Sequence, residues 1–317
     1  MVRVIAVASG KGGVGKTTVA LNLGTVLTYH FKKNVTLIDC NVTTSHLGMY
    51  LGMYYSPITL NKALRGEVSL KEAVYTHFGG MKVVPASLSL SDLEGVDITK
   101  LREKIESISD ESEIIFLDGA PGLGREAIAT LKAADEVLFV TTPFVPSVMD
   151  IVRTMEVVNE IGIKPIGIIL NMVNREKYEM TSLEVEQLTR VPVIGSIPFD
   201  KNVYKSLVEK LPVVIFRPNT KATKSFVKLG ANLIGYEYKK KSILSRIADK
   251  LKLRRKTIVT PPALLGPDLQ SQMMFSEAPP SWPASLNIDT SQPDIQRPKM
   301  PGPEMPHPEK MTNTDRE

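Results

Sequence analysis

Residues 10–17 read Gly-Lys-Gly-Gly-Val-Gly-Lys-Thr and match the pattern G-x-x-x-x-G-K-[ST] at every fixed position. The stretch follows an apolar, β-branched run at 2–8 and opens a run of helical periodicity at 17–29. Glycines let the backbone curl without Cβ clashes. A strand, a glycine-rich turn and a helix in this order direct backbone N–H groups toward an anion. The stretch therefore predicts a phosphate-binding loop.

The residue types of this loop predict which groups would hold a nucleotide and its metal. Lys16 has the length to reach β- and γ-phosphates, and the Thr17 hydroxyl is a ligand for Mg²⁺. The predicted nucleotide contacts of the loop are Gly10, Lys11, Gly12, Gly13, Val14, Gly15, Lys16, Thr17 and Thr18. Taken alone, the pattern also fits a glycine-rich turn with a solvated lysine.

Strand and helix signals alternate along most of the chain. Apolar runs of strand length lie at 2–8, 35–38, 81–85, 114–117, 137–140, 165–170 and 191–197. Helix-period stretches lie between several of them, at 17–29, 98–108, 147–161 and 220–234. Strands that are apolar at nearly every position are typical of a parallel sheet covered on both faces. We expect an α/β fold, a doubly wound, mostly parallel sheet with helices on both faces.

The composition changes after this region and predicts three segments. Residues 1–238 form the expected nucleotide-binding domain. Residues 239–256 hold nine lysines and arginines against one aspartate, so they form a strongly basic segment. Residues 257–317 carry 12 of the 22 prolines and more acidic than basic residues. This composition predicts a disordered, proline-rich tail, which is either an inert linker or an arm whose few apolar residues bind an unknown protein partner.

Several classes of protein are excluded by what the sequence lacks. The chain has one cysteine, Cys40, which excludes an internal disulfide framework and any cysteine-pair metal or iron–sulfur site within one chain. No apolar run approaches the ~18 residues of a membrane span. The apolar run at the N-terminus is too short, and ends too abruptly in glycines, for a signal peptide. We expect a cytoplasmic protein.

The longer string Ser-Gly-Lys-Gly-Gly-Val-Gly-Lys-Thr-Thr, residues 9–18, resembles the deviant Walker A motif of the ParA/MinD superfamily of P-loop ATPases. In that family the early lysine, here Lys11, reaches across a dimer interface to the partner's nucleotide. The resemblance covers residues 1–238. It implies a homodimer held by ATP and Mg²⁺ that hydrolyses ATP to ADP and phosphate, with Lys11 and Lys16 as catalytic residues.

Two further stretches resemble the switch regions of this family. Residues 36–48 resemble switch I, and the resemblance gives Asp39 the role of supporting Mg²⁺. Residues 114–122 resemble the Walker B strand and switch II, where Asp118 would hold a Mg²⁺-bound water. An aspartate at the end of a buried strand is costly unless it binds something. The alternative for Asp118 is a cap on the helix that follows.

The resemblance also implies a pocket for the base. Asn171 resembles the family's adenine-reading asparagine, and Pro198 and Asp200 resemble the loop that closes over the base. Met172 departs from the arginine that usually follows the asparagine. Ordinary turn chemistry after a strand is the alternative for Asn171 and Asp200.

Switch I contains the departure that bears most on catalysis. The family usually has Asp-x-Asp here, and the second aspartate orients or activates the attacking water; this chain has Asn41. A carboxamide can hydrogen-bond a water but does not accept its proton as a carboxylate does. One hypothesis is a slow ATPase in which Asn41 still positions water. The other is an ATP-bound scaffold without useful turnover that recruits a partner through its tail.

The basic segment indicates where such a dimer would reside. On a helix over 242–252 the apolar residues fall within one arc of about 140°: Ile243, Leu244, Ile247, Ala248 and Leu251. This resembles the membrane-targeting helix of MinD proteins and implies peripheral binding to an anionic membrane surface, the inner face of the cell membrane. A helix packed on its own domain is one alternative. A ParA-like DNA-partitioning ATPase is another, but an apolar face has no use on phosphate and no aromatics interleave the charges.

Overall fold

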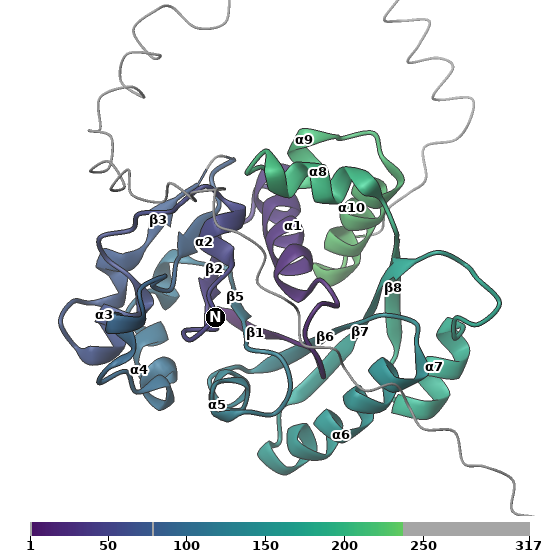
Figure 1. Ribbon diagram of the computed structural model, residues 1–317, viewed down its shortest axis with the longest axis horizontal. Coiled ribbons are helices and arrows are strands. Elements are labelled where there is room, and N and C mark those ends of the chain that lie inside the picture. Colours follow the sequence, from purple (N-terminus) through teal and green to yellow (C-terminus); the bar gives the residue numbers. More distant parts are fainter. Residues whose placement is uncertain (1, 78, 237–317) are drawn as a thin grey trace, which may run out of the picture. The chain divides into compact units, whose positions relative to one another are not determined.

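The computed structural model describes residues 2–77 and 79–236, which form one eight-stranded sheet with helices on both faces (Figure 1). The strand order is β3-β4-β2-β5-β1-β6-β7-β8. Every pairing is parallel except that of β3 with β4. The strands are β1 (Arg3–Ala8), β2 (Val35–Asp39), β3 (Tyr75–Thr76), β4 (Lys82–Val84), β5 (Ile114–Asp118), β6 (Glu136–Thr141), β7 (Lys164–Val173) and β8 (Val193–Pro198). The predicted doubly wound sheet is confirmed.

The helices lie between the strands, as the alternation of the sequence predicts. The α-helices are α1 (Lys16–Tyr29), α2 (Leu47–Tyr50), α3 (Leu60–Arg65), α4 (Leu101–Glu106), α5 (Arg125–Lys132), α6 (Val145–Ile161), α7 (Ser182–Thr189), α8 (Lys201–Val208), α9 (Val213–Phe216) and α10 (Lys221–Leu233). Short 3-10 turns occupy η1 (Leu70–Ala73), η2 (Leu90–Leu93), η3 (Ile98–Lys100) and η4 (Ser109–Glu111).

Alternate residues of the central strand enter cores on opposite faces of the sheet. Ile5 and Val7 of β1 pack with residues of α1 and α10 on one face. Val4 packs with α3 and α4, and Ala6 with α6 and α7, on the other. Because both faces are covered, the strands are buried nearly throughout and read as continuous apolar runs.

The structure departs from the predicted elements in a few places. The helix predicted at 98–108 is the 3-10 turn η3 followed by α4, which ends at Glu106. The strand β3 has two residues and no pattern long enough to detect. The basic segment 239–256 and the tail 257–317 lie outside the described residues. Within the described part of the chain, no helix is long and apolar enough to cross a membrane.

The topology brings the predicted site residues to one edge of the sheet. The strand order reverses at β1, which has β5 on one side and β6 on the other. In open α/β sheets the crevice outside the carboxyl ends of the strands, at such a reversal, binds ligands. The loops after β1, β2, β5, β7 and β8 all leave from these ends. Asp39 and Asp118 are register partners on adjacent strands.

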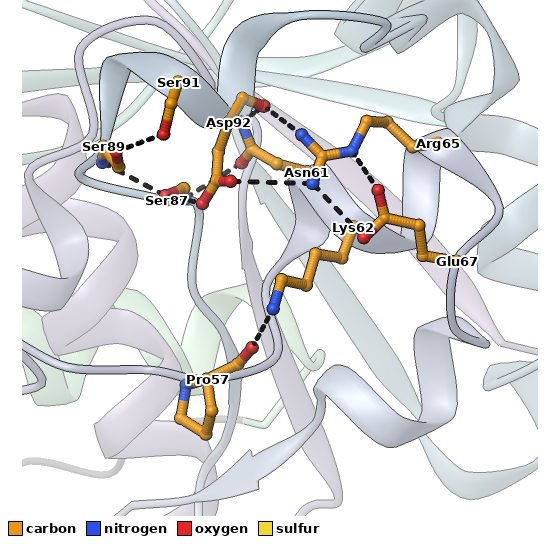
Figure 2. A network of polar contacts seen from close by, with 9 residues as sticks. All are labelled: Pro57, Asn61, Lys62, Arg65, Glu67, Ser87, Ser89, Ser91 and Asp92. Carbon is orange, nitrogen blue, oxygen red and sulfur yellow. Dashed lines mark hydrogen bonds and ion pairs between the residues drawn. The ribbon is translucent and has the colours of Figure 1, made fainter.

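A network of polar contacts fastens the loop after β4 to α3 (Figure 2). The Ser87 backbone N–H donates to Asn61 Oδ1 at 2.9 Å, and the Ser87 hydroxyl donates to Asp92 at 2.6 Å. Arg65 donates to the Asp92 carbonyl at 3.0 Å and forms an ion pair with Glu67 at 2.6 Å. We call these five residues the edge network. It holds a loop at the carboxyl end of β4 in place with bonds among its own members.

Candidate functional site

The phosphate loop joins β1 to α1, as its sequence predicts. Gly15 caps α1 with φ 85°, a left-handed conformation that disfavours side chains, and a Cβ there would fall 2.3 Å from Asn171 Nδ2. A Cβ on Gly10 would clash with Asp150 of α6 at 2.2 Å. No side chain caps the N-terminus of α1. The first N–H groups of α1 are therefore directed at a ligand position, which suits a phosphate.

The loop borders a cavity of about 370 Å³ that gathers most of the predicted residues. Its lining is Ser9, Lys11, Gly12, Gly13, Val14, Gly15, Lys16, Thr17, Thr18, Asn41, Thr44, His46, Tyr50, Pro121, Met172, Tyr204 and Leu207. Gly10 is absent from the lining because it packs against α6. Glycines, two lysines and hydroxyls on one wall are the groups that bind a polyphosphate.

Lys16, which lines this cavity, forms a buried ion pair with Asp118, which lies outside the lining. Lys16 Nζ lies 2.5 Å from Asp118 Oδ1, and the two side chains are 7% and 1% exposed. The helix after β5 begins only at Arg125 and is capped by Gly124, so the capping alternative for Asp118 is wrong. Asp118 thus neutralises the charge of Lys16. It is the same carboxylate that is expected to hold a Mg²⁺-bound water.

Asp39 is the second buried carboxylate of the site. It accepts hydrogen bonds from the Ser45 hydroxyl at 2.7 Å and from the Leu47 backbone N–H at 3.3 Å. Burial and the neighbouring Asp118 carboxylate raise the pKa of Asp39 to about 7. Burial makes it costly for both carboxylates to be charged at once. A divalent cation beside them would stabilise their charged forms.

The donor set fits Mg²⁺ bound together with a nucleotide. Within the described residues no three acidic, histidine or cysteine side chains gather to hold a metal alone. Mg²⁺ normally binds one or two carboxylates plus substrate phosphates and water. Thr17 lines the cavity, while Asp39 and Asp118 end adjacent strands. Such an ion would be held by the Thr17 hydroxyl and the two carboxylates, and it would neutralise phosphate charge.

Asn41 lines the cavity, but its carboxamide is engaged within switch I. Its Nδ2 donates to the Thr44 carbonyl at 2.8 Å, and its Oδ1 accepts from the Thr44 hydroxyl at 3.0 Å. Thr43 in turn donates to Glu126 of α5. The loop that holds Asn41 is therefore fixed both internally and to the helix that follows switch II. The amide has one lone pair and one N–H left for a water.

The residues predicted to enclose the base meet in a small adjoining cavity of about 40 Å³. It is lined by Asn171, Pro198 and Asp200, together with Thr18 and Met172 of the larger cavity. Asn171 Nδ2 donates to the Val14 carbonyl at 2.8 Å, which ties the end of β7 to the phosphate loop. Asp200 caps α8 by accepting from the Asn202 N–H at 2.9 Å. Asp200 therefore both caps α8, as ordinary turn chemistry predicts, and lines the small cavity.

The cavity also contains residues that sequence reasoning missed. His46 and Tyr50 come from α2 and the turn before it, and Tyr204 and Leu207 come from α8. No motif marks them, because their place at the cavity depends on the tertiary positions of two short helices, α2 and α8. The one sequence signal for these residues is weak: an aromatic residue, Tyr50, follows shortly after switch I.

Known proteins match this chain in sequence and in fold. Residues 5–213 match the CobQ/CobB/MinD/ParA nucleotide binding domain family. An uncharacterised ATP-binding protein of Methanocaldococcus jannaschii is 34% identical over 257 residues, which are 79% of this chain and 97% of that protein. The antiactivator FleN of Pseudomonas aeruginosa is 28% identical over 71% of this chain and 84% of its own.

Solved structures of similar proteins show the same architecture. The cell division ATPase MinD of Pyrococcus furiosus superposes with a TM-score of 0.71 at 30% identity, over 74% of this chain and 99% of that one. MinD of Pyrococcus horikoshii, which was solved with Mg-ADP, gives 0.70 at 29% identity over 74% and 96%. The family match at residues 5–213 includes the phosphate loop and both carboxylates, and the two solved structures match over nearly their whole length. The chain belongs to the CobQ/CobB/MinD/ParA family of nucleotide-binding domains, and its relatives are P-loop ATPases of the MinD and ParA type.

Proposed function

We propose that this chain is a MinD-like ATPase that dimerises around ATP and Mg²⁺ and then binds the cytoplasmic membrane to position a partner. Lys16 leaves Asp118 for the phosphates when nucleotide binds, and Thr17, Asp39 and Asp118 face the metal. Asn41 orients water without accepting its proton, so hydrolysis is slow.

The observation that carries this proposal is the state of Lys11. Lys11 lies in the phosphate loop, lines the cavity and is exposed. Its backbone carbonyl is fixed by the Ser9 hydroxyl at 3.0 Å, yet its ammonium pairs with no carboxylate in the described part of the chain. Lys16, by contrast, is buried and reaches the phosphates from the same chain. An exposed, unpaired cation beside a phosphate site suits the nucleotide of a second copy.

Membrane binding is supported by the sequence of 242–252, which has an apolar arc flanked by basic triplets. One copy of so short a helix binds weakly, and two copies in a dimer bind far more strongly. Dimerisation by ATP would therefore also control membrane attachment. Retention on DNA at physiological salt would support the ParA-like alternative instead.

The test combines oligomer size with sedimentation on anionic liposomes, in ATP, ADP and no nucleotide. We expect dimers and sedimentation with ATP alone. Lys11→Ala should abolish both while nucleotide still binds, whereas Lys224→Ala, an exposed lysine on α10, should change neither. Deleting 242–256 should abolish sedimentation and leave the dimer. A chain that stays monomeric in saturating ATP would contradict the proposal.

A second candidate is an ATP-bound scaffold that does not turn over. It is favoured by the two hydrogen bonds between Asn41 and Thr44, which hold the carboxamide within switch I. Single-turnover measurements separate the two functions. Phosphate release within hours supports the slow ATPase. No release, together with restored hydrolysis in Asn41→Asp, supports the scaffold.

A further inference from the structure

Helix α8 packs Val203 against the core and places two other apolar residues, Tyr204 and Leu207, at the cavity beside the phosphate loop. Of its eight residues only Ser206 is buried. Leu207 is partly buried and Tyr204 is 52% exposed, and both line the cavity. A short helix in a domain of this size normally buries its apolar stripe in the core. Tyr204 and Leu207 share this cavity with Lys16 and Thr17, the first two residues of α1.

Tyr204 stands where the phosphate end of the site meets the base end. It lines both the 370 Å³ cavity beside the phosphate loop and the small cavity formed by Asn171 and Pro198. Thr18 and Met172 line both as well. A nucleotide with its phosphates on the loop and its base at Asn171 has to pass this junction with its ribose.

A second tyrosine lines the same space from another element. Tyr50 belongs to α2, directly after switch I, and is half-buried. Burial raises the pKa of the Tyr50 hydroxyl, and the nearby Asp118 carboxylate adds to this shift. The Tyr204 ring is not stacked into the core: it rests at 5.8 Å, centroid to centroid, against the exposed Phe199. Tyr204 therefore has a ring face available to a ligand.

We propose that Tyr204 packs against the nucleoside part of the nucleotide, with Tyr50 lining the same space, and thereby selects nucleotides over bare polyphosphates. The inference rests on the proposed nucleotide binding and adds a contact that the phosphate loop cannot provide. A tyrosine ring gives a flat apolar face at little loss of side-chain entropy, and its hydroxyl can bond a ribose hydroxyl. The half-exposed ring becomes covered when the nucleotide binds.

The test compares two ligands that share phosphates but differ in the nucleoside. Binding of Mg-ADP and of Mg-pyrophosphate is measured by titration calorimetry on the full chain. Tyr204→Ala should weaken ADP binding about 5- to 20-fold. This lies toward the lower end of the range for base–aromatic stacking, because the ring is half exposed. Pyrophosphate binding should change less than about twofold. Tyr204→Phe, which keeps the ring, should lose less ADP affinity than Tyr204→Ala.

The matched control is Tyr178→Ala, which removes an exposed tyrosine stacked on Phe144 away from the cavity. It should leave both ligands unchanged. Should Tyr204→Ala not fold, Tyr204→Leu keeps the apolar bulk and gives the same comparison. Equal ADP affinity in variant and parent, or an equal loss for pyrophosphate, would overturn the inference. A parent that binds pyrophosphate but not ADP would do so too, whereas a parent that binds neither would overturn the proposed function itself.

Discussion

Two ion pairs at the carboxyl edge of the sheet differ in how completely they are satisfied. Arg65 and Asp92 lie 3.5 Å apart in the edge network, with side chains 17% and 27% exposed. Arg65 also pairs with Glu67, and Asp92 accepts from Ser87 (Figure 2). Lys16 and Asp118 are more deeply buried, yet one bond joins them. An ammonium has three donors, so Lys16 has capacity for a ligand where Arg65 is already engaged.

The size of a cavity does not distinguish the two regions. The edge network borders a cavity of about 340 Å³, nearly as large as that of the phosphate loop. A still larger one, about 570 Å³, includes Arg3 and Lys33, whose charges are paired with Glu136 and Glu113. What sets the phosphate loop apart is uncapped N–H groups and a cation with donors to spare. We therefore locate the functional site by the hydrogen-bond donors that remain free to bind a ligand.

The largest expected effect comes from removing the cation of the phosphate loop. Lys16→Ala should weaken ADP by roughly 100-fold or more, since several charge-assisted hydrogen bonds to phosphate are lost. Arg65→Ala removes a basic residue from the edge network and should leave ADP binding within about twofold. Titration calorimetry on both variants decides. Equal losses would show that the comparison between the two regions is wrong.

Breaking the same pair from its acidic side should lower stability. Asp118→Asn removes the carboxylate paired with the buried Lys16, leaves only the more distant charge of Asp39 nearby, and should cost about 3 kcal/mol of the free energy of unfolding. Urea unfolding without nucleotide measures this loss. Saturating pyrophosphate without metal should recover part of it, because phosphate replaces the carboxylate beside Lys16. A loss below about 1 kcal/mol would mean that the pair is solvated rather than buried.

In the edge network a substitution should reduce stability and leave ligand binding intact. Asn61 is fully buried; it accepts from the Ser87 N–H and donates to the Asp92 carbonyl at 3.2 Å. Asn61→Ala should therefore destabilise the fold by about 2 kcal/mol, the scale of buried groups left unpaired. Asn232→Ala, at an exposed position of α10, is the control and should change little. Weakened ADP binding in Asn61→Ala would link the two regions.

The contrast also explains which parts of the site could be predicted from the sequence. The phosphate loop, Asp39 and Asp118 are marked by local patterns, because each ends a strand or starts a helix at the sheet edge. The edge network is not marked, since Arg65 and Asp92 belong to separate segments whose contact depends on tertiary packing. Tyr204 was missed for the same reason. The bonds of Asn41 to Thr44 depend on the loop's conformation, which the residue types leave open.

The smallest effect we predict is a pH dependence confined to the β4 side of the sheet. Glu111, at the end of η4, binds Lys71 at 2.5 Å and Lys82 of β4 at 3.0 Å. Hydrogen bonds from Lys71 and then Lys82 lower the pKa of Glu111 to about 2. A carboxyl whose folded pKa lies below its unfolded value stabilises the fold above the unfolded pKa, about 4.5, and loses that stability as pH falls toward 2.

Glu111→Gln should therefore reduce stability near neutral pH and flatten its decline between about pH 4.5 and 2. Because Lys71 is exposed and Glu111 and Lys82 are only partly buried, salt screens both ion pairs, and the difference should shrink at high ionic strength. Urea unfolding across this pH range measures it, with Glu160→Gln on the exposed face of α6 as the control. ADP binding at neutral pH should stay unchanged, since the pair lies outside the cavity of the phosphate loop. If the free energy of unfolding of Glu111→Gln fell as steeply with decreasing pH as that of the parent, the acid sensitivity would belong to the buried carboxylates instead.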